Sequence, residues 1–163
     1  MNEFFKTGLL NTTKYIELCG PFAFSHIRGS YKYPEISGTA EFYEFKNGVF
    51  IVWEINGIPF DSHSVHGFHI HNGTTCGGCG KDAFPESGTH FDKEDNIHPF
   101  HSGDLPPIFS NNGYAFGSVF TDRITKDDIL NKTIILHSAP DDFTTQPSGN
   151  SGEKIACGVI VPI

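Results

Sequence analysis

Alternating apolar and polar positions predict a β-hairpin between residues 37 and 56. The apolar positions of its second half fall on one face of a strand: Val49, Ile51, Trp53 and Ile55. Residues 46–48, Lys-Asn-Gly, form the predicted turn, because Asn-Gly supplies the positive φ angles that a tight hairpin needs. In the first half Ala40 and Phe42 share a face and Phe45 is out of step, which predicts a β-bulge.

Four further segments have the apolar pattern of strands: residues 66–71, 114–121, 133–137 and 156–161. The segment 121–133 has room for one helical turn and for no long helix. The chain is rich in Gly, Pro and Phe, and only 18% of its residues are charged. This composition fits a turn-rich, all-β domain better than a coiled coil or a disordered acidic chain.

Two long segments between the predicted strands show no periodicity. The first, residues 71–113, is rich in Gly and Pro and far exceeds the roughly 12 to 15 residues at which a structureless loop becomes unusual. Such a loop is either disordered or held by cross-links, and its His, Asp and Cys residues offer metal ligands and disulfides for that purpose. The second, residues 138–154, again mixes Gly, Pro, Ser and Asp.

Length and charge narrow the class of protein. A chain of 163 residues suffices for a hydrophobic core, and we expect a single domain over residues 1–163. The formal net charge is −8 and no cluster of Lys and Arg occurs, which argues against binding to nucleic acid or to an anionic membrane. No segment approaches the roughly 18 apolar residues of a membrane span, and the N-terminus lacks the pattern of a secretory signal.

The four cysteines leave several pairings open. Cys76 and Cys79 enclose two glycines, which fits a metal half-site, a redox pair, or one partner of a disulfide to Cys157 plus a spare thiol. A cysteine zinc site is disfavoured, since the chain has no second Cys-x-x-Cys pair. We expect Cys19 to be a small buried hydrophobe.

Histidine is concentrated in one part of the chain, because seven of the nine lie within residues 63–101. His69 and His71 are two positions apart in a predicted strand, so their side chains project from one face and are able to grip a single ion. The long loop adds three imidazoles and a carboxylate, those of His90, His98, His101 and Asp104. Three histidines and one aspartate are a suitable ligand set for a tetrahedral zinc site. His137 ends a predicted apolar strand, where a histidine without a partner is most often a packed core residue.

Several motifs follow one another in a fixed order: Gly67-Phe68-His69-Ile70-His71, Gly88-Thr89-His90, His98-x-x-His101-x-x-Asp104, Ile135-Leu136-His137 with Asp141, Gly149-Asn150-Ser151-Gly152 and Ala156-Cys157-Gly158. In order and spacing they resemble the copper/zinc superoxide dismutase family over residues 36–161. The resemblance is closer to bacterial members, because Cys76 lies five residues after His71. Residues 1–35, an N-terminal strand region, match weakly. The implied fold is an immunoglobulin-like Greek-key β-sandwich or flattened barrel, with copper on its outer wall beneath two long functional loops.

The resemblance implies a role for each motif residue. Copper would be held by four imidazoles, those of His69, His71, His90 and His137. Zinc would be held by the bridging His90 together with His98, His101 and Asp104. Asp141 matches the family's carboxylate that ties a copper-ligand histidine to a zinc-ligand histidine, and His66 matches a histidine that hydrogen-bonds the backbone and binds no metal. Cys157 would pair with Cys76 and pin the long loop to the last strand.

The implied activity is the disproportionation of superoxide to oxygen and hydrogen peroxide. In the family that the chain resembles, copper cycles between Cu(II) and Cu(I), and zinc is redox-silent. The histidine that corresponds to His90 releases copper, takes up a proton and donates it to the product. The family's guiding arginine, three residues before the final cysteine, is Lys154 here, which keeps the charge and loses the planar guanidinium. Cys79 lies outside the family pattern, so its pairing stays open.

The expected cofactors are one copper and one zinc per subunit. The expected partner is the small-molecule substrate superoxide, with a homodimer as the candidate assembly and with no nucleic acid and no membrane. The alternative function is a non-catalytic copper- and zinc-binding relative, but histidines at all four copper positions favour catalysis. Since no secretory signal is visible, we expect a cytoplasmic protein, although the family's relatives are mostly exported.

Overall fold

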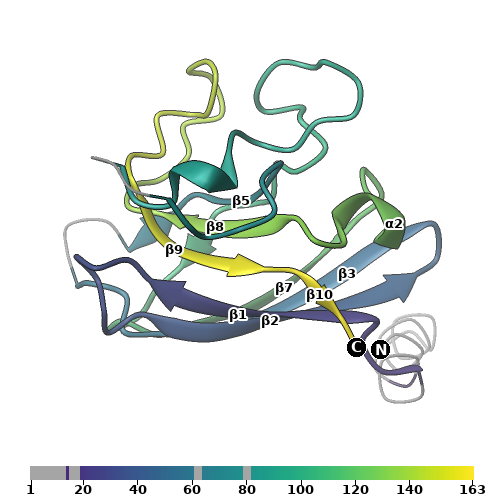
Figure 1. Cartoon of the computed structure of the whole chain (residues 1–163), viewed down its shortest axis with the longest axis horizontal. Coiled ribbons are helices and arrows are strands. Elements are labelled where there is room, and N and C mark those ends of the chain that lie inside the picture. Colours follow the sequence, from purple (N-terminus) through teal and green to yellow (C-terminus); the bar gives the residue numbers. More distant parts are fainter. Residues whose placement is uncertain (1–13, 15–18, 61–63, 79–81) are drawn as a thin grey trace, which may run out of the picture.

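Figure 1 shows the computed structural model of the chain, a curled antiparallel β-sheet with little helix. The structure describes residues 14, 19–60, 64–78 and 82–163. The strands are β1 (Ala23–Gly29), β2 (Ser37–Phe45), β3 (Gly48–Asn56), β4 (Val65–His66), β5 (Phe68–His71), β6 (Ile108–Phe109), β7 (Ala115–Thr121), β8 (Thr133–His137), β9 (Lys154–Val159) and β10 (Val161–Pro162). The short helical elements are η1 (Pro85–Ser87) and α2 (Lys126–Ile129). None of the helices within these ranges has the length and apolar character to cross a membrane.

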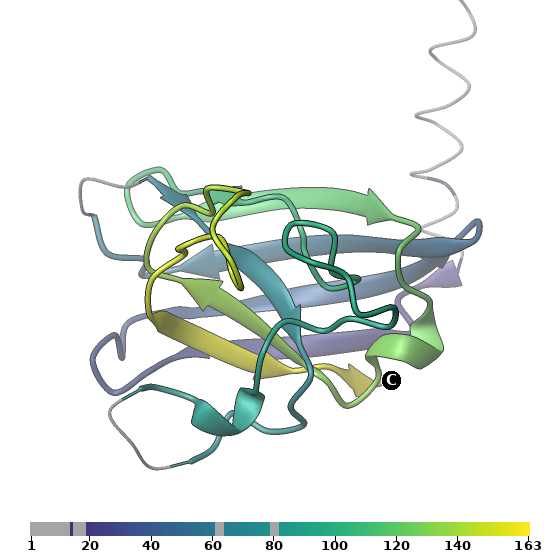
Figure 2. The ribbon, with the colours of Figure 1, turned by 90° about the horizontal axis from the view of Figure 1, so that it is seen from above.

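The strand order confirms the Greek-key expectation. In the main sheet the order is β5-β8-β9-β1-β2-β3-β7, with β10 also paired to β1, while β4 and β6 form a separate pair. Strands that are distant in the chain, such as β5 and β8, therefore lie side by side. The sheet curls so that β5 and β8 stand above β1, β2 and β3, and both long loops rise on the side of β5 and β8 (Figure 1). The same half-barrel is seen from above in Figure 2.

The predicted hairpin is present, but without the predicted bulge. The β2–β3 register runs unbroken from Ser37 opposite Asn56 to Phe45 opposite Gly48. Phe45 breaks the apolar alternation because it belongs to the outer face, where its ring packs edge-on against Phe120 at a centroid distance of 5.8 Å. The bulge prediction was wrong because this partner lies on β7, which the local pattern of the hairpin does not reveal.

The turn of this hairpin also differs from the prediction. The positive φ angle is at Lys46, with a value of 54°, and Asn47 and Gly48 do not adopt one. Gly48 is instead the first residue of β3. A Cβ at this position would collide with the backbone oxygen of Thr121 on β7. The glycine is needed for close packing of β3 against β7, and the tight turn does not depend on it.

The other predicted strands are present, one with the predicted boundaries and three with shifted ones. The segment 133–137 matches β8, and 114–121 becomes β7. The segment 66–71 is divided at Gly67 between β4 and β5, and residues 156–161 fall in β9 and β10. The expected helical turn is α2, where the backbone and side-chain groups of Thr125 bond the Asp128 carboxylate at the helix start.

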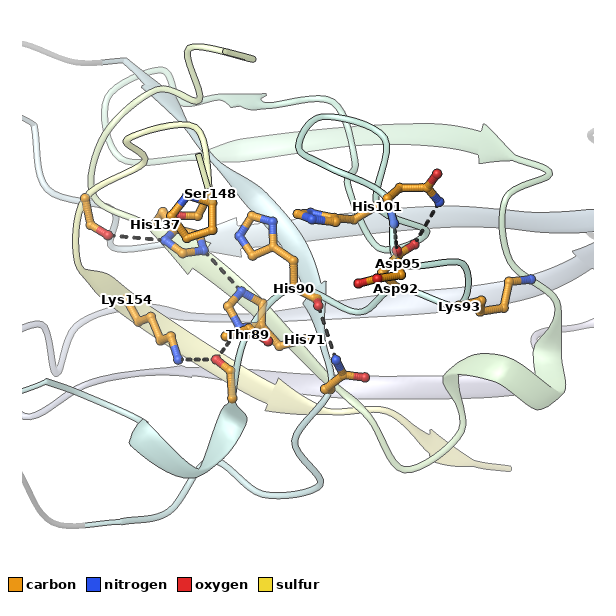
Figure 3. A pocket seen from close by; sticks show the side chains of 15 residues that line it. His71, Thr89, His90, Asp92, Lys93, Asp95, His101, His137, Ser148 and Lys154 are labelled. Atoms are coloured by element: carbon orange, nitrogen blue, oxygen red, sulfur yellow. Dashed lines mark hydrogen bonds between the residues drawn. The ribbon is translucent and has the colours of Figure 1, made fainter. Parts of the chain in front are cut away.

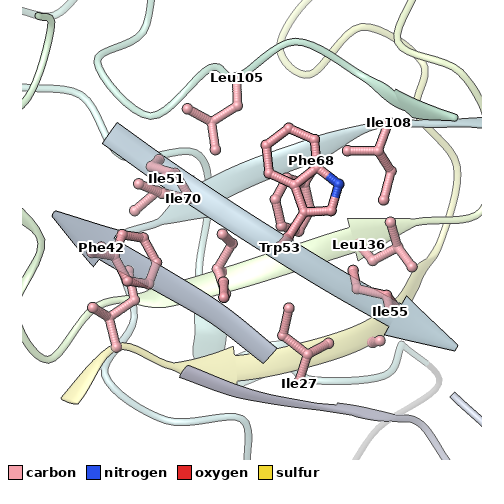
Figure 4. Packing of buried hydrophobic residues seen from close by; sticks show 14 of the residues in the cluster. Ile27, Phe42, Ile51, Trp53, Ile55, Phe68, Ile70, Leu105, Ile108 and Leu136 are labelled. Atoms are coloured by element: carbon pink, nitrogen blue, oxygen red, sulfur yellow. The ribbon is translucent and has the colours of Figure 1, made fainter. Parts of the chain in front are cut away.

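Strand alternation separates the core from the histidines. Phe68 and Ile70 of β5 point into the hydrophobic core, where Phe68 packs against Trp53 at a centroid distance of 5.5 Å. Figure 4 shows these side chains meeting others from β2, β3 and β8. His69 and His71 alternate with them and so lie on the opposite face of β5. Both histidines are nevertheless buried, because the long loops cover that face.

Backbone pairing and a disulfide hold the described parts of the long segment 71–113, residues 71–78 and 82–113, against the sheet. Ile70 donates a hydrogen bond to the Gly103 carbonyl (2.9 Å) and accepts one from Phe91 (2.8 Å), so the loop returns along the exposed edge of β5. The loop is also joined to β9 by the disulfide Cys76–Cys157, which closes a sequence separation of 81 residues. This pairing confirms the expectation from the family resemblance.

The two remaining cysteines have different outcomes. Cys19 is a free, exposed thiol, so the expectation of a buried hydrophobe was wrong. Its position precedes β1, outside the strand pattern that fills the core. Cys79 lies outside the described residues.

Candidate metal centre

Two groups of side chains lie beneath the loops. Within each group the possible metal-ligand atoms all lie within 4.8 Å of one another. One group contains only imidazoles: His69, His71, His90 and His137. The other combines three imidazoles with a carboxylate: His90, His98, His101 and Asp104. Only His90 belongs to both groups, and Figure 3 shows it between His71 and His137 on one side and His101 on the other.

Two imidazoles of the first group are fixed by backbone carbonyls. His71 donates from Nδ1 to the Gly88 oxygen (3.0 Å), and His137 donates from Nδ1 to the Gly152 oxygen (3.4 Å). These bonds place the proton on Nδ1 and leave Nε2 with a free lone pair. The two Nε2 atoms lie 3.3 Å apart, a spacing at which two lone pairs repel unless a proton or a cation lies between them.

Asp141 fixes one histidine from each group. Its Oδ2 accepts a hydrogen bond from His69 Nε2 (2.8 Å) and its Oδ1 accepts one from His98 Nε2 (2.9 Å). The Nδ1 atoms of both histidines are buried and accept no hydrogen bond. Gly149, with φ of 67°, lies directly against this carboxylate, and a Cβ there would collide with Asp141 Oδ1. The glycine therefore allows the second loop to close over the pair.

His90 presents one ring nitrogen to each group. Its Nδ1 lies 2.7 Å from Asp104 Oδ1, while its Nε2 is buried without a hydrogen-bond partner. The His90 ring stacks close to that of His69, with centroids 4.0 Å apart. One imidazole thus spans the two groups through its two nitrogens.

The second group converges on the Asp104 carboxylate. His98 Nδ1 and His101 Nδ1 lie 3.1 and 3.2 Å from Asp104 Oδ2, but neither has the alignment of a hydrogen bond. Buried polar atoms without partners are rare in proteins because they cost free energy. Four buried nitrogens of this kind, those of His69, His90, His98 and His101, point instead to cations as their partners. The residues present therefore fit two metal ions.

Comparison with known proteins identifies the family. The family model described as copper/zinc superoxide dismutase (SODC) matches residues 36–160. The chain belongs to the copper/zinc superoxide dismutase family. A relative named superoxide dismutase, Cu-Zn, from Photobacterium leiognathi is 34% identical over 137 residues, 76% of this chain and 78% of the relative.

Two further relatives with the same name extend the comparison. One from Legionella pneumophila is 32% identical over 135 residues, 78% of this chain and 79% of the relative. One from Candida albicans is 33% identical over 150 residues, 82% of this chain and 93% of the relative. Copper and zinc are the metals of this family, and the two groups of ligand atoms give this dismutase-family chain a place for each.

The site favours neutral imidazoles, the form that binds metal ions. Burial, reinforced by neighbouring imidazoles, holds the pKa of His71 and of His137 well below the ordinary value. Burial also lowers the pKa of His90 to about 4. Burial alone would raise the pKa of Asp141, but hydrogen bonds from His69, the Phe143 backbone and His98 outweigh it and lower that pKa to about 2. The carboxylate therefore stays ionised between the two groups.

Lys154 lines a cavity of about 730 Å³ together with His71, His90 and His137. Its ammonium donates to Ser87 Oγ (2.8 Å), to the Gly88 oxygen (2.7 Å) and to the Phe84 oxygen (3.4 Å). Burial lowers the pKa of this lysine. All three hydrogen bonds of the ammonium go to the first long segment, residues 71–113. Lys154 therefore acts on the cavity through its charge.

The remaining predicted residues lie outside both groups. His66 donates from Nδ1 to the His137 backbone oxygen (3.1 Å), with Nε2 3.3 Å from Ser110 Oγ. His63 lies outside the described residues. The sequence did not reveal the carbonyls of Gly88 and Gly152, because a backbone oxygen has no side-chain signature.

The histidine pKa values predict how the metal-free protein responds to pH. The pKa values of His71, His90 and His137 are lower in the folded state than in the unfolded chain, where histidine titrates near 6.5. Below about pH 6.5 the unfolded chain binds more protons, so this stability is lost as the pH falls toward 4. We expect the melting temperature of the metal-free protein to fall by several degrees between pH 7.5 and 5.0 in calorimetry.

The exposed His26 supplies the control for this measurement. The variant His26→Gln should keep the same pH dependence, since its imidazole lies outside the buried groups. A melting temperature that stays constant between pH 7.5 and 5.0 would contradict the argument.

Proposed function

We propose that the protein is a superoxide dismutase, which converts two superoxide anions and two protons into oxygen and hydrogen peroxide. The observation that carries this proposal is His90, a buried imidazole shared by an all-histidine group and a three-histidine, one-carboxylate group. Membership of the copper/zinc superoxide dismutase family over residues 36–160 supports it. The non-catalytic alternative is not favoured, because no histidine of the all-imidazole group is missing.

The donor sets suit different metals. Copper would be held by His69 Nδ1 and by the Nε2 atoms of His71, His90 and His137. Zinc would be held by the Nδ1 atoms of His90, His98 and His101 and by the Asp104 carboxylate. Imidazole suits copper, and three histidines with one carboxylate are a closed set typical of zinc. Copper, when bound, supplies the one-electron redox chemistry of both half-reactions.

The protein's own groups would manage the proton and the site geometry. His90 lines the cavity and is the group placed to hold a proton at Nε2 and pass it to the peroxide product. Asp104 Oδ1 lies 2.7 Å from His90 Nδ1, so these two atoms are placed to bind the same zinc ion. Asp141 keeps His69 and His98 in the tautomers that present Nδ1.

Lys154 would attract the substrate. A chain with a net charge of −8 repels an anion at long range, so capture depends on local positive potential. Lys154 supplies such a charge in the lining of the cavity. Its hydrogen bonds to Ser87 and Gly88 keep the ammonium in place.

Activity of the metal-loaded protein tests the proposed function. Protein loaded with copper and zinc should hold one ion of each per chain by elemental analysis and should dismutate superoxide in a pulse-radiolysis or cytochrome c assay. The same protein loaded with zinc alone should be inactive, because zinc has no accessible redox change. Full occupancy of both metals without dismutation would contradict the proposal and favour the non-catalytic alternative.

Charge reversal at Lys154 tests the capture of superoxide. We expect Lys154→Glu to lower the rate constant several-fold at low ionic strength, with a smaller effect at high salt, because screening weakens the attraction. The matched control is Lys46→Glu, which makes the same change of charge in the β2–β3 turn, away from the cavity lining. Equal effects of the two substitutions would show that Lys154 has no special part in guiding the anion.

Further expectations from the sequence stay predictions. These are the single domain over residues 1–163, the homodimer and the cytoplasmic location. Superoxide as the small-molecule substrate follows from the proposed function. The absence of nucleic-acid and membrane partners also remains a prediction, supported by the net charge of −8.

A further inference from the structure

Asn72 holds the backbone that carries His90. It directly follows His71, the last residue of β5. Its backbone N–H donates to the Thr89 oxygen (2.9 Å), and its side-chain Nδ2 donates to the His90 oxygen (3.3 Å). Asn72 is part of the lining of the cavity that His90 also lines. One residue therefore binds two consecutive carbonyls of the segment that carries His90.

The His90 carbonyl depends on this side chain because of the local pairing. His71 and His90 form an antiparallel bridge, flanked by the bonds from Phe91 to Ile70 and from Asn72 to Thr89. In this arrangement His90 occupies a non-hydrogen-bonded position, so its own carbonyl receives no N–H from the facing strand. Among the described residues, the Asn72 amide is the donor that serves this oxygen.

The position of the His90 backbone decides where its ring nitrogens lie. Nδ1 is 2.7 Å from Asp104 Oδ1, and Nε2 belongs with the Nε2 atoms of His71 and His137. Asp104 restrains the ring from one side only. If the backbone shifted, rotation of the side chain would keep Nδ1 at the zinc site that it shares with Asp104, and Nε2 would move relative to the other imidazoles. Small displacements of this kind matter, since a misplacement of about 1 Å costs roughly 100-fold in rate.

We propose that Asn72 is a positioning residue for His90, which acts by holding the His90 carbonyl so that the imidazole stays aligned with both groups. This inference rests on the proposed function, in which His90 binds both metals. Asn72 itself is in neither group of ligand atoms. Its amide lines the same cavity as Lys154, so solvent competes with the His90 carbonyl for this donor once the geometry loosens.

The test compares substitutions at Asn72 in the copper- and zinc-loaded protein. Asn72→Ala removes the donor, and Asn72→Asp keeps the shape but replaces the N–H donor by an acceptor. We expect both to change the Cu(II) electron paramagnetic resonance and visible spectra and to lower kcat/KM by about 3- to 10-fold, the scale of one hydrogen bond. Asn72→Gln keeps an amide and should restore part of the native spectrum.

The spectra separate positioning from a general loss of structure. The matched control Asn111→Ala removes an exposed asparagine side chain from a turn outside the cavity lining and should leave both spectra and kcat/KM unchanged. If Asn72→Ala does not fold, Asn72→Asp provides the same readout. Native Cu(II) spectra in the folded Asn72→Ala or Asn72→Asp protein would overturn the inference. A wild-type protein that binds copper but lacks dismutation would overturn the proposed function instead, and the spectral comparison would still test Asn72.

Discussion

One carboxylate, that of Asp141, connects the parts on which the site depends. Its two oxygens accept hydrogen bonds from His69 on β5 and from His98 in the first long loop, while Asp141 itself belongs to the second loop. Each of these histidines is thereby left with Nδ1 facing its own group of ligand atoms. If this double hydrogen bond were lost, the strand and both loops would lose their common anchor.

The strands of the sheet place His69 and His71 on one face, and the long loops bury them there. Alternation along β5 sends Phe68 and Ile70 into the core and His69 and His71 to the other face. The loops then bury those imidazoles, which lowers the pKa of His71 and favours its neutral form. Burial without hydrogen-bond partners is costly for a polar atom. The stability of the fold and the demand for metal ions therefore arise from the same arrangement of strands and loops.

Sequence reasoning succeeded where the information is local or carried by motif order. Alternation predicts the β2–β3 hairpin and β8, and motif order predicts the family and the Cys76–Cys157 disulfide. The predictions were wrong where the conformation or the residue type depends on a partner that is distant in the sequence. Phe45 packs against Phe120 of β7. Position 48 requires glycine because a Cβ there would collide with the backbone of β7. The backbone acceptors of the site, such as the Gly88 carbonyl, have no sequence signature because every residue carries the same group.

The metal affinities of an Asp141→Asn variant test the account most directly. The neighbouring Asp142→Asn is a matched control, because among the described residues the Asp142 side chain bonds only Thr144 and Thr145, within its own loop. Competition titrations with chelators should show weaker binding of both copper and zinc in Asp141→Asn, by about 10- to 100-fold as for other residues that orient metal ligands. The control should bind both metals as the wild type does. Unchanged affinity for both metals in Asp141→Asn would contradict the claim that this carboxylate couples the two sites.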